Sequence, residues 1–227
     1  MGLIVKNTTY LGLGDILCPY PCKGCGRLGE AFCECCKNDI IFDHLNYCPK
    51  CQRIVIDGCC NFCHLPPTFV AGWKDDIIGQ LVQDYKYESM RALGGILAEI
   101  LDGILPIIDG KVEIVPLPTA QKHIRERGFD HTRKVAQKLA RKRGWKVSKM
   151  LIRKKDTVQV GTNEKMRVKQ ANEAYEATKK AEKDVTYVIF DDVWTTGASM
   201  RAAIKKLRRA GARKIMVAIL AVSRTRD

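Results

Sequence analysis

The pattern of apolar positions divides the chain into a short N-terminal zone without periodicity and a longer zone of alternating strand and helix patterns. The longer zone starts near Phe69. Its mostly apolar stretches, typical of buried strands, lie at 112–116, 185–190 and 214–222. Apolar residues at helical spacing predict helices near 77–82, 93–101, 130–143 and 200–210. Gly144 and Gly211 stand where helix-ending residues are expected. Because strands alternate with helices, we predict an α/β domain with a parallel sheet flanked by helices.

A proline pair separates the two zones. Pro66-Pro67 interrupts regular structure, so we predict a small unit over residues 1–66 and the α/β domain over residues 67–227. No apolar run is long enough to span a bilayer, and the first residues lack the pattern of a signal peptide. We therefore expect a cytoplasmic protein without membrane insertion.

All eleven cysteines lie in the first zone, between Cys18 and Cys63. Eight of them form four Cys-x-x-Cys pairs: Cys22/Cys25, Cys33/Cys36, Cys48/Cys51 and Cys60/Cys63. Each pair can place two thiolates on one metal ion, and two pairs complete a tetrahedral four-sulfur site. The spacing predicts two structural zinc ions, since sites filled by four cysteines leave no open position for catalysis.

The pairing of these cysteines has two solutions. Sequential sites join the first pair with the second and the third with the fourth, whereas a cross-braced arrangement joins the first with the third and the second with the fourth. We favour the sequential one, because shorter loops cost less entropy to close. Cys18 is left over, and Cys35 or Cys59 can replace a neighbour in register. His44 and His64 are further possible ligands, although surface positions are expected for both.

The positive charge is concentrated in one part of the chain. The formal net charge is +14, and residues 121–180 hold 19 Lys and Arg against 6 Asp and Glu. Such a block indicates an anionic partner, either phosphate ligands or nucleic acid. The alternative is a solvated basic face without a partner.

The most informative segment is VIFDDVWTTGAS at 188–199, in which an apolar strand delivers Asp191 and Asp192 to a loop that opens a helix. Ligands of parallel sheets bind at this end of the strands, and a helix start suits a phosphate. Thr195, Thr196 and Ser199 add hydroxyl donors, and Gly197 permits close backbone approach. The carboxylates can accept hydrogen bonds from the vicinal hydroxyls of a sugar. The Gly-rich signatures of P-loop and dinucleotide folds are absent.

This segment resembles the PRPP-binding motif of type I phosphoribosyltransferases. Nearly the whole chain resembles the ComF family of competence proteins, which join a double zinc ribbon to a phosphoribosyltransferase domain. The matching features are the cysteine pairs, DDVWTTGAS, Val115-Pro116-Leu117-Pro118, Arg125-Glu126-Arg127-Gly128-Phe129 and, more weakly, Lys86-Tyr87.

The resemblance implies a role for each matching position. It places the ribose hydroxyls on Asp191 and Asp192, and pyrophosphate near Arg125 and Arg127. The residues that it places around the 5′-phosphate are Thr195, Thr196, Gly197, Ala198 and Ser199. It also implies magnesium bound with PRPP, and a mobile flap at residues 156–161.

The chain departs from the family pattern at two sites, and its segment between Gln159 and Asn172 is also slightly longer than usual. Asp130-His131 replaces the usual Asn-Gln, and Trp194 replaces an aliphatic residue, where it can either stack on a base or pack in the fold. Thr195 stands where purine salvage enzymes carry an acidic base, so no catalytic residue is identified.

Two functions follow from the resemblance. The chain is expected to be a PRPP-binding competence factor that handles single-stranded DNA during DNA uptake, with a helicase as its partner. The alternative is an active phosphoribosyltransferase in nucleotide metabolism with an unknown acceptor. A PRPP-sensing regulator is a third possibility, which no residue specifically requires.

Overall fold

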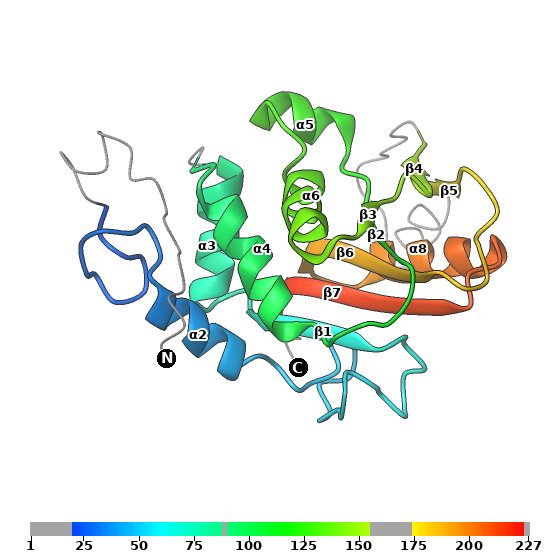
Figure 1. The fold of residues 1–227 in the computed structure, drawn as a ribbon, viewed down its shortest axis with the longest axis horizontal. Coiled ribbons are helices and arrows are strands. Elements are labelled where there is room, and N and C mark those ends of the chain that lie inside the picture. Colours follow the sequence, from blue (N-terminus) through cyan, green and yellow to red (C-terminus); the bar gives the residue numbers. More distant parts are fainter. Residues whose placement is uncertain (1–19, 88–89, 155–173, 225–227) are drawn as a thin grey trace, which may run out of the picture.

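A parallel sheet of five strands, in the order β1-β7-β6-β2-β3, forms the centre of the computed structural model (Figure 1). The structure describes residues 20–87, 90–154 and 174–224. The sheet strands are β1 (Thr68–Trp73), β2 (Val112–Pro116), β3 (Lys146–Val147), β6 (Thr186–Trp194) and β7 (Lys214–Val222). A separate antiparallel pair is formed by β4 (Leu151–Arg153) and β5 (Tyr175–Ala177). The predicted fold class, a parallel sheet flanked by helices behind a cysteine-rich region, is confirmed.

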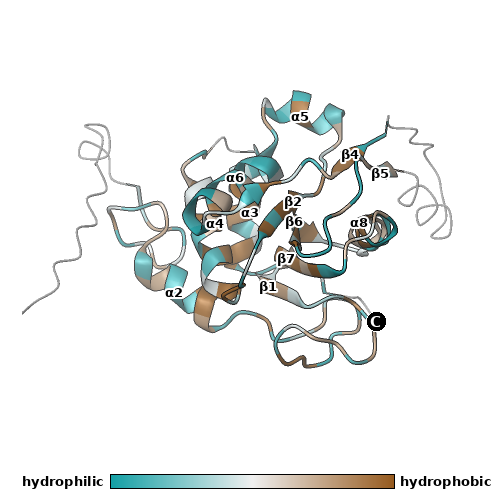
Figure 2. Cartoon of the chain, turned by 45° about the vertical axis from the view of Figure 1, so that its right-hand side comes forward, coloured by the Kyte–Doolittle hydropathy of each residue, from teal (hydrophilic) through white to brown (hydrophobic). Residues whose placement is uncertain are grey.

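Helices cover both faces of the sheet (Figure 2). The helices are α2 (Glu34–Phe42), α3 (Ile77–Tyr87), α4 (Leu93–Ile104), α5 (Gln121–Arg127), α6 (His131–Arg143) and α8 (Ala198–Arg209). Three of them, α3, α4 and α6, share one core with Val188 and Phe190 of β6. On the other face, α8 packs with Tyr187 and Ile189 of the same strand. Because β6 is buried on both faces here, residues 187–190 form a continuous apolar run rather than an alternating one.

The predicted elements agree with the structure over most of the α/β unit. Strands β2 and β7 have the predicted bounds, and Gly144 ends α6 in the left-handed conformation, with φ 68°. Strand β6 is longer than predicted and extends to Trp194, so Asp191 and Asp192 lie within the strand rather than beyond it. Helices α2 and α5 and strand β1 were not predicted as individual elements.

Both parts of the cysteine-rich region contact the α/β unit. The first part is held by ion pairs to the helices, Lys23 Nζ to Asp84 Oδ2 at 2.9 Å and Lys37 Nζ to Glu99 Oε2 at 2.6 Å. The second part meets the edge strand β1, where the Thr68 amide donates to the Gly58 carbonyl at 2.9 Å. The predicted unit boundary at residues 66–67 falls just before this strand and stays a prediction.

Candidate functional site

The eight paired cysteines form two groups of four: Cys22, Cys25, Cys33 and Cys36, and Cys48, Cys51, Cys60 and Cys63. Within each group all sulfur atoms lie within 4.8 Å of one another, and the grouping is the sequential one. The sulfur atoms of Cys22 and Cys36 are 3.8 Å apart, and those of Cys51 and Cys60 are 3.7 Å apart. A tetrahedron with Zn–S bonds of about 2.3 Å has edges of about 3.8 Å, so both groups fit zinc. A disulfide needs about 2.05 Å, which these distances exclude.

Backbone amides prepare these cysteines for metal binding. The amides of Gly24 and Cys33 donate to Cys22 Sγ at 3.4 and 3.3 Å. Burial alone raises the pKa of the Cys22 thiol, but backbone hydrogen bonds outweigh it and lower the pKa to about 6. The same balance lowers the pKa of Cys60 to about 7. In the same groups burial raises the pKa of Cys36, Cys48 and Cys63. Each group therefore holds one thiol of lowered pKa, and thiolate is the form that binds metal.

The remaining possible ligands do not join either group. Cys35 and Cys59 are exposed and outside both sets of sulfur atoms. His44 Nδ1 lies 2.7 Å from the Ile41 carbonyl oxygen, to which it donates when protonated there. Cys18 lies outside the described residues, as does the 156–161 stretch.

The topology places a switch point at the carboxyl ends of β2 and β6. The connection from β2 to β3 carries α6 over one face of the sheet, and the connection from β6 to β7 carries α8 over the other. The segments that follow β2 and β6 separate after the Leu117 amide, which donates to the Phe190 carbonyl at 2.8 Å. Ligands of open parallel sheets bind at such a switch point. Residues that follow β2 and residues at the end of β6 therefore face each other here.

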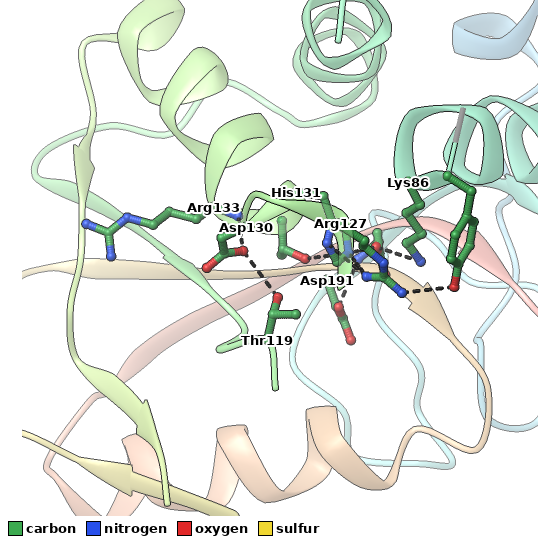
Figure 3. A network of polar contacts seen from close by, with 10 residues as sticks. Lys86, Thr119, Arg127, Asp130, His131, Arg133 and Asp191 are labelled. Atoms are coloured by element: carbon green, nitrogen blue, oxygen red, sulfur yellow. Dashed lines mark hydrogen bonds and ion pairs between the residues drawn. The ribbon is translucent and has the colours of Figure 1, made fainter. Parts of the chain in front are cut away.

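A chain of polar contacts lies at this switch point (Figure 3). Asp192 Oδ2 lies 2.8 Å from Lys86 Nζ, and both side chains are 11% exposed. The same oxygen contacts His131 Nε2 at the start of α6. Arg127 Nη1 lies 3.1 Å from His131 Nδ1, and Arg127 Nη2 donates to the Tyr87 hydroxyl at 2.9 Å. Residues from α3, α5, α6 and β6 thus form one network.

The hydrogen-bond donors in this network determine where the His131 proton lies and which charge Asp192 carries. A guanidinium can only donate, so His131 Nδ1 accepts from Arg127 and His131 Nε2 carries the proton that points to Asp192. Burial alone would raise the pKa of Asp192, but the hydrogen bond from His131 and the charge of Lys86 outweigh it and hold the pKa well below its usual range. Asp192 is therefore a buried, ionised carboxylate.

Asp191 has a different environment. Adjacent residues of a strand project to opposite faces, and Asp191 points away from Lys86 and His131 (Figure 3). Its Oδ1 accepts from the Asp192 amide at 3.0 Å. Burial and the negative charge of Asp192 raise its pKa well above the usual range. The two acids, which the sequence pattern presents as a pair, therefore differ in the direction of their side chains and in the direction of their pKa shifts.

The predicted phosphate loop joins β6 to α8. Gly197, with φ 69°, caps the start of α8, and the Ala198 amide lies 3.4 Å from the Thr196 hydroxyl oxygen, which accepts its hydrogen bond. A Cβ at Gly197 would lie 2.2 Å from Cζ2 of Trp194, so only glycine fits. Trp194 is 3% exposed and packs beneath the loop. Its ring is therefore part of the core and is not available to stack on a base.

The two predicted pyrophosphate arginines lie on α5 but differ in surroundings. Arg125 is exposed, whereas Arg127 is half-buried in the polar network. Sequence reasoning gave no role to Lys86 or His131, which are the direct partners of Asp192. The Lys86-Tyr87 pair and the unusual Asp130-His131 were the signals available. Asp130 caps α6 by accepting from the Arg133 amide at 3.1 Å.

Comparisons with known proteins add little to this geometry. No protein-family model and no curated protein matches the chain. Among solved structures, the chain is similar to one described as the allosteric regulatory enzyme of purine biosynthesis, with 17% identity and a TM-score of 0.36. The match covers 63% of this chain and 26% of that one, so this chain spans only a minor part of that protein's length. A likeness of this extent carries no functional argument.

Proposed function

We propose that the switch point between β2 and β6 binds PRPP or a related phosphoribosyl ligand. The observation that carries this proposal is the switch point itself, where the loop of residues 195–199 opens α8 beside the acidic end of β6. Free amides and the dipole at a helix start favour a phosphate, and the neighbouring acids suit sugar hydroxyls. The resemblance to type I phosphoribosyltransferases rests on the same residues.

We assign each part of this ligand to the residues that lie nearest to it in the proposal. The 5′-phosphate occupies the loop that contains Thr195, Thr196 and Ser199, and Asp191 accepts hydrogen bonds from the ribose. Asp192 is already paired with Lys86, so it contributes by orienting that lysine. Magnesium accompanies the pyrophosphate group, mostly on the ligand's own oxygens. Exposed Arg125 can turn toward the same group.

Isothermal titration with PRPP and magnesium tests this site. Replacing Asp191 and Asp192 together by Asn keeps the shape and removes the charge, and should weaken binding by about 1.5–3 kcal/mol. Asp191→Asn alone provides a variant without a change in the buried ion pair. Asp184→Asn, at an exposed acid before β6, is the matched control and should bind like the parent. Unchanged affinity in both Asp191 variants would exclude the proposed ribose contact.

We further propose that the protein is a competence factor that handles single-stranded DNA, with a helicase as its partner. The supporting observation is a row of exposed basic residues on α6, Lys134, Lys138 and Arg141, spaced by three or four positions and so on one helix face. Flexible single strands can follow such a row, and their binding is strongly salt-dependent.

Arg143 does not belong to that row. Its guanidinium contacts Asp102 Oδ1 at 2.5 Å and donates to the carbonyls of Leu105 and Pro106 at 2.8 and 2.6 Å. It therefore anchors the C-terminal end of α4. In a DNA-binding test, replacing Arg143 would weaken the fold as well as the basic surface, and the two effects could not be separated.

A better DNA test replaces Lys134, Lys138 and Arg141 by Gln. Binding should weaken, and the log–log salt slope should fall by roughly 0.7 for each phosphate that the variant no longer neutralises. PRPP affinity should stay the same. Replacing exposed Lys205 and Arg208 on α8, at the other face of the sheet, provides the control. If both variants bind single-stranded DNA equally at every salt concentration, the row on α6 is only a solvated face.

The alternative is an active phosphoribosyltransferase, in which a nitrogen nucleophile displaces pyrophosphate from PRPP. Thr195 takes the position of the acidic base in salvage enzymes, and it is exposed. The cation near the leaving group would come from magnesium and Arg125. Pyrophosphate release from PRPP across a panel of bases distinguishes this activity from binding alone.

A further inference from the structure

A cavity opens at the opposite edge of the sheet, where β2, β3 and β6 begin. Its volume is about 620 Å³, which is in the range of small-molecule sites. Lys111 and Glu113 line it from the start of β2, Trp145 and Lys146 from the start of β3, and Glu182 from the turn before β6. None of these residues belongs to the switch point at the carboxyl ends of the strands.

Glu113 is the unusual residue of this cavity. It is only 5% exposed, and its Oε1 lies 3.5 Å from Lys146 Nζ. Its Oε2 is buried without a hydrogen-bond partner among the described residues. Tyr187, its partner across the sheet, accepts from the Glu182 amide at 2.9 Å, and no described residue donates to Glu113 Oε2. Buried acceptors are rarely left without a donor, so a donor from outside the chain is expected.

The charged side chains that line the cavity indicate which chemical class the missing donor belongs to. Arg143 lines the cavity, but its guanidinium is already bound to Asp102 and to the end of α4. Lys111 is exposed at the rim, and the Lys146 side chain is 72% exposed. The cavity therefore offers a buried acceptor inside and two accessible cations at its mouth. A ligand that matches both carries an N–H donor at one end and an anionic group at the other.

We propose that this cavity binds a nucleotide through the exocyclic amino group of its base. The Glu113 carboxylate accepts from the amino group, as carboxylates do from the amino group of cytosine, and Lys111 and Lys146 face the phosphate. The same chemistry is presented by a free mononucleotide and by a nucleotide within a single strand. The site is distinct from the proposed PRPP site and does not depend on it.

Titration calorimetry with CMP and UMP tests the base contact, because these ligands differ at the position of the amino group. CMP should bind the parent at least about tenfold more tightly, since the uracil carbonyl would place an acceptor against Glu113. Glu113→Gln keeps the shape but offers its own donor, so it should abolish the preference for CMP. Glu182→Gln removes the other acid of the same cavity and should retain the preference.

Two further measurements show whether the site takes a free nucleotide or a base within a strand, and whether it is independent of the proposed PRPP site. In the first arm, oligo(dC) is compared with oligo(dT). If oligo(dC) binds at least tenfold more tightly while CMP and UMP do not differ, the site takes a base within a strand. This assignment also requires that Glu113→Gln removes the difference. Asp191→Asn should leave every one of these preferences unchanged, whatever its effect on PRPP. Equal binding of the amino and carbonyl bases in both arms, or a preference that survives Glu113→Gln, overturns the proposal. The comparison within the parent needs no variant, so a folding defect cannot obscure it.

Discussion

Replacing Lys86 by Met should strongly destabilise the fold, because it leaves the ionised Asp192 without its cationic partner. The two groups lie 2.8 Å apart, and each side chain is only 11% exposed. Removing one partner of a buried pair costs about 3–5 kcal/mol. His131 still contacts the carboxylate, so the lower end, about 3 kcal/mol, is expected. For a chain of this size that corresponds to a fall in Tm of roughly 6–12 °C.

A surface pair provides the control for this measurement. Lys154 lies 3.2 Å from Glu176, with side chains 57% and 52% exposed. Exposed pairs contribute about 0–1 kcal/mol, so Lys154→Met should change stability little. Urea unfolding in zinc-containing buffer measures both variants. The double variant Lys86→Met, Asp192→Asn should lose less than the sum of the two single variants, since it leaves no unpaired charge.

The loss of stability caused by Lys86→Met should also depend on pH. The folded-state pKa of Asp192 is lowered, so ionised Asp192 stabilises the parent above its unfolded pKa of about 3.9, and this contribution is lost as the pH falls through the folded value. In Lys86→Met, burial raises the pKa of Asp192 without the opposing charge of Lys86, and a proton on this carboxylate removes the unpaired negative charge. The difference between parent and variant should therefore shrink from pH 8 to pH 5. A loss below about 1 kcal/mol at pH 8, the most that an exposed pair contributes, or a loss equal to that of Lys154→Met, would refute the buried ion pair.

Three other outcomes follow from the structure. Metal analysis should return two zinc ions per chain, and Cys22→Ser should reduce this to one, whereas a parent value of one or none contradicts the pair of four-sulfur sites. Gly197→Ala should lower stability by about 1–3 kcal/mol and weaken PRPP binding, because the new Cβ would strike Trp194; a Tm like that of the parent is the contrary result. Arg143→Gln should lower the Tm because it frees the end of α4, whereas Arg141→Gln should not, and equal effects would contradict the anchoring role.

Features set by neighbouring residues could be predicted from the sequence. Strand β7 is an almost continuous apolar run and β2 a mostly apolar one because both of their faces are buried, and that pattern is visible without a structure. The Cys-x-x-Cys spacing is likewise local, since a tight turn is enough to bring two thiolates to one metal. Gly144 ends α6 because a left-handed residue at that point favours glycine.

Features set by distant residues needed the tertiary structure. Asp192 meets Lys86 and His131 only because α3 and α6 cover the same face of β6, and no local pattern reports that contact. The same holds for Arg143, which looks in the sequence like one more surface cation and instead anchors α4. The residue types at these positions are plain in the sequence. Their partners, burial and charge states are decided by long-range packing, since the free energy of a buried charge depends on what surrounds it in space.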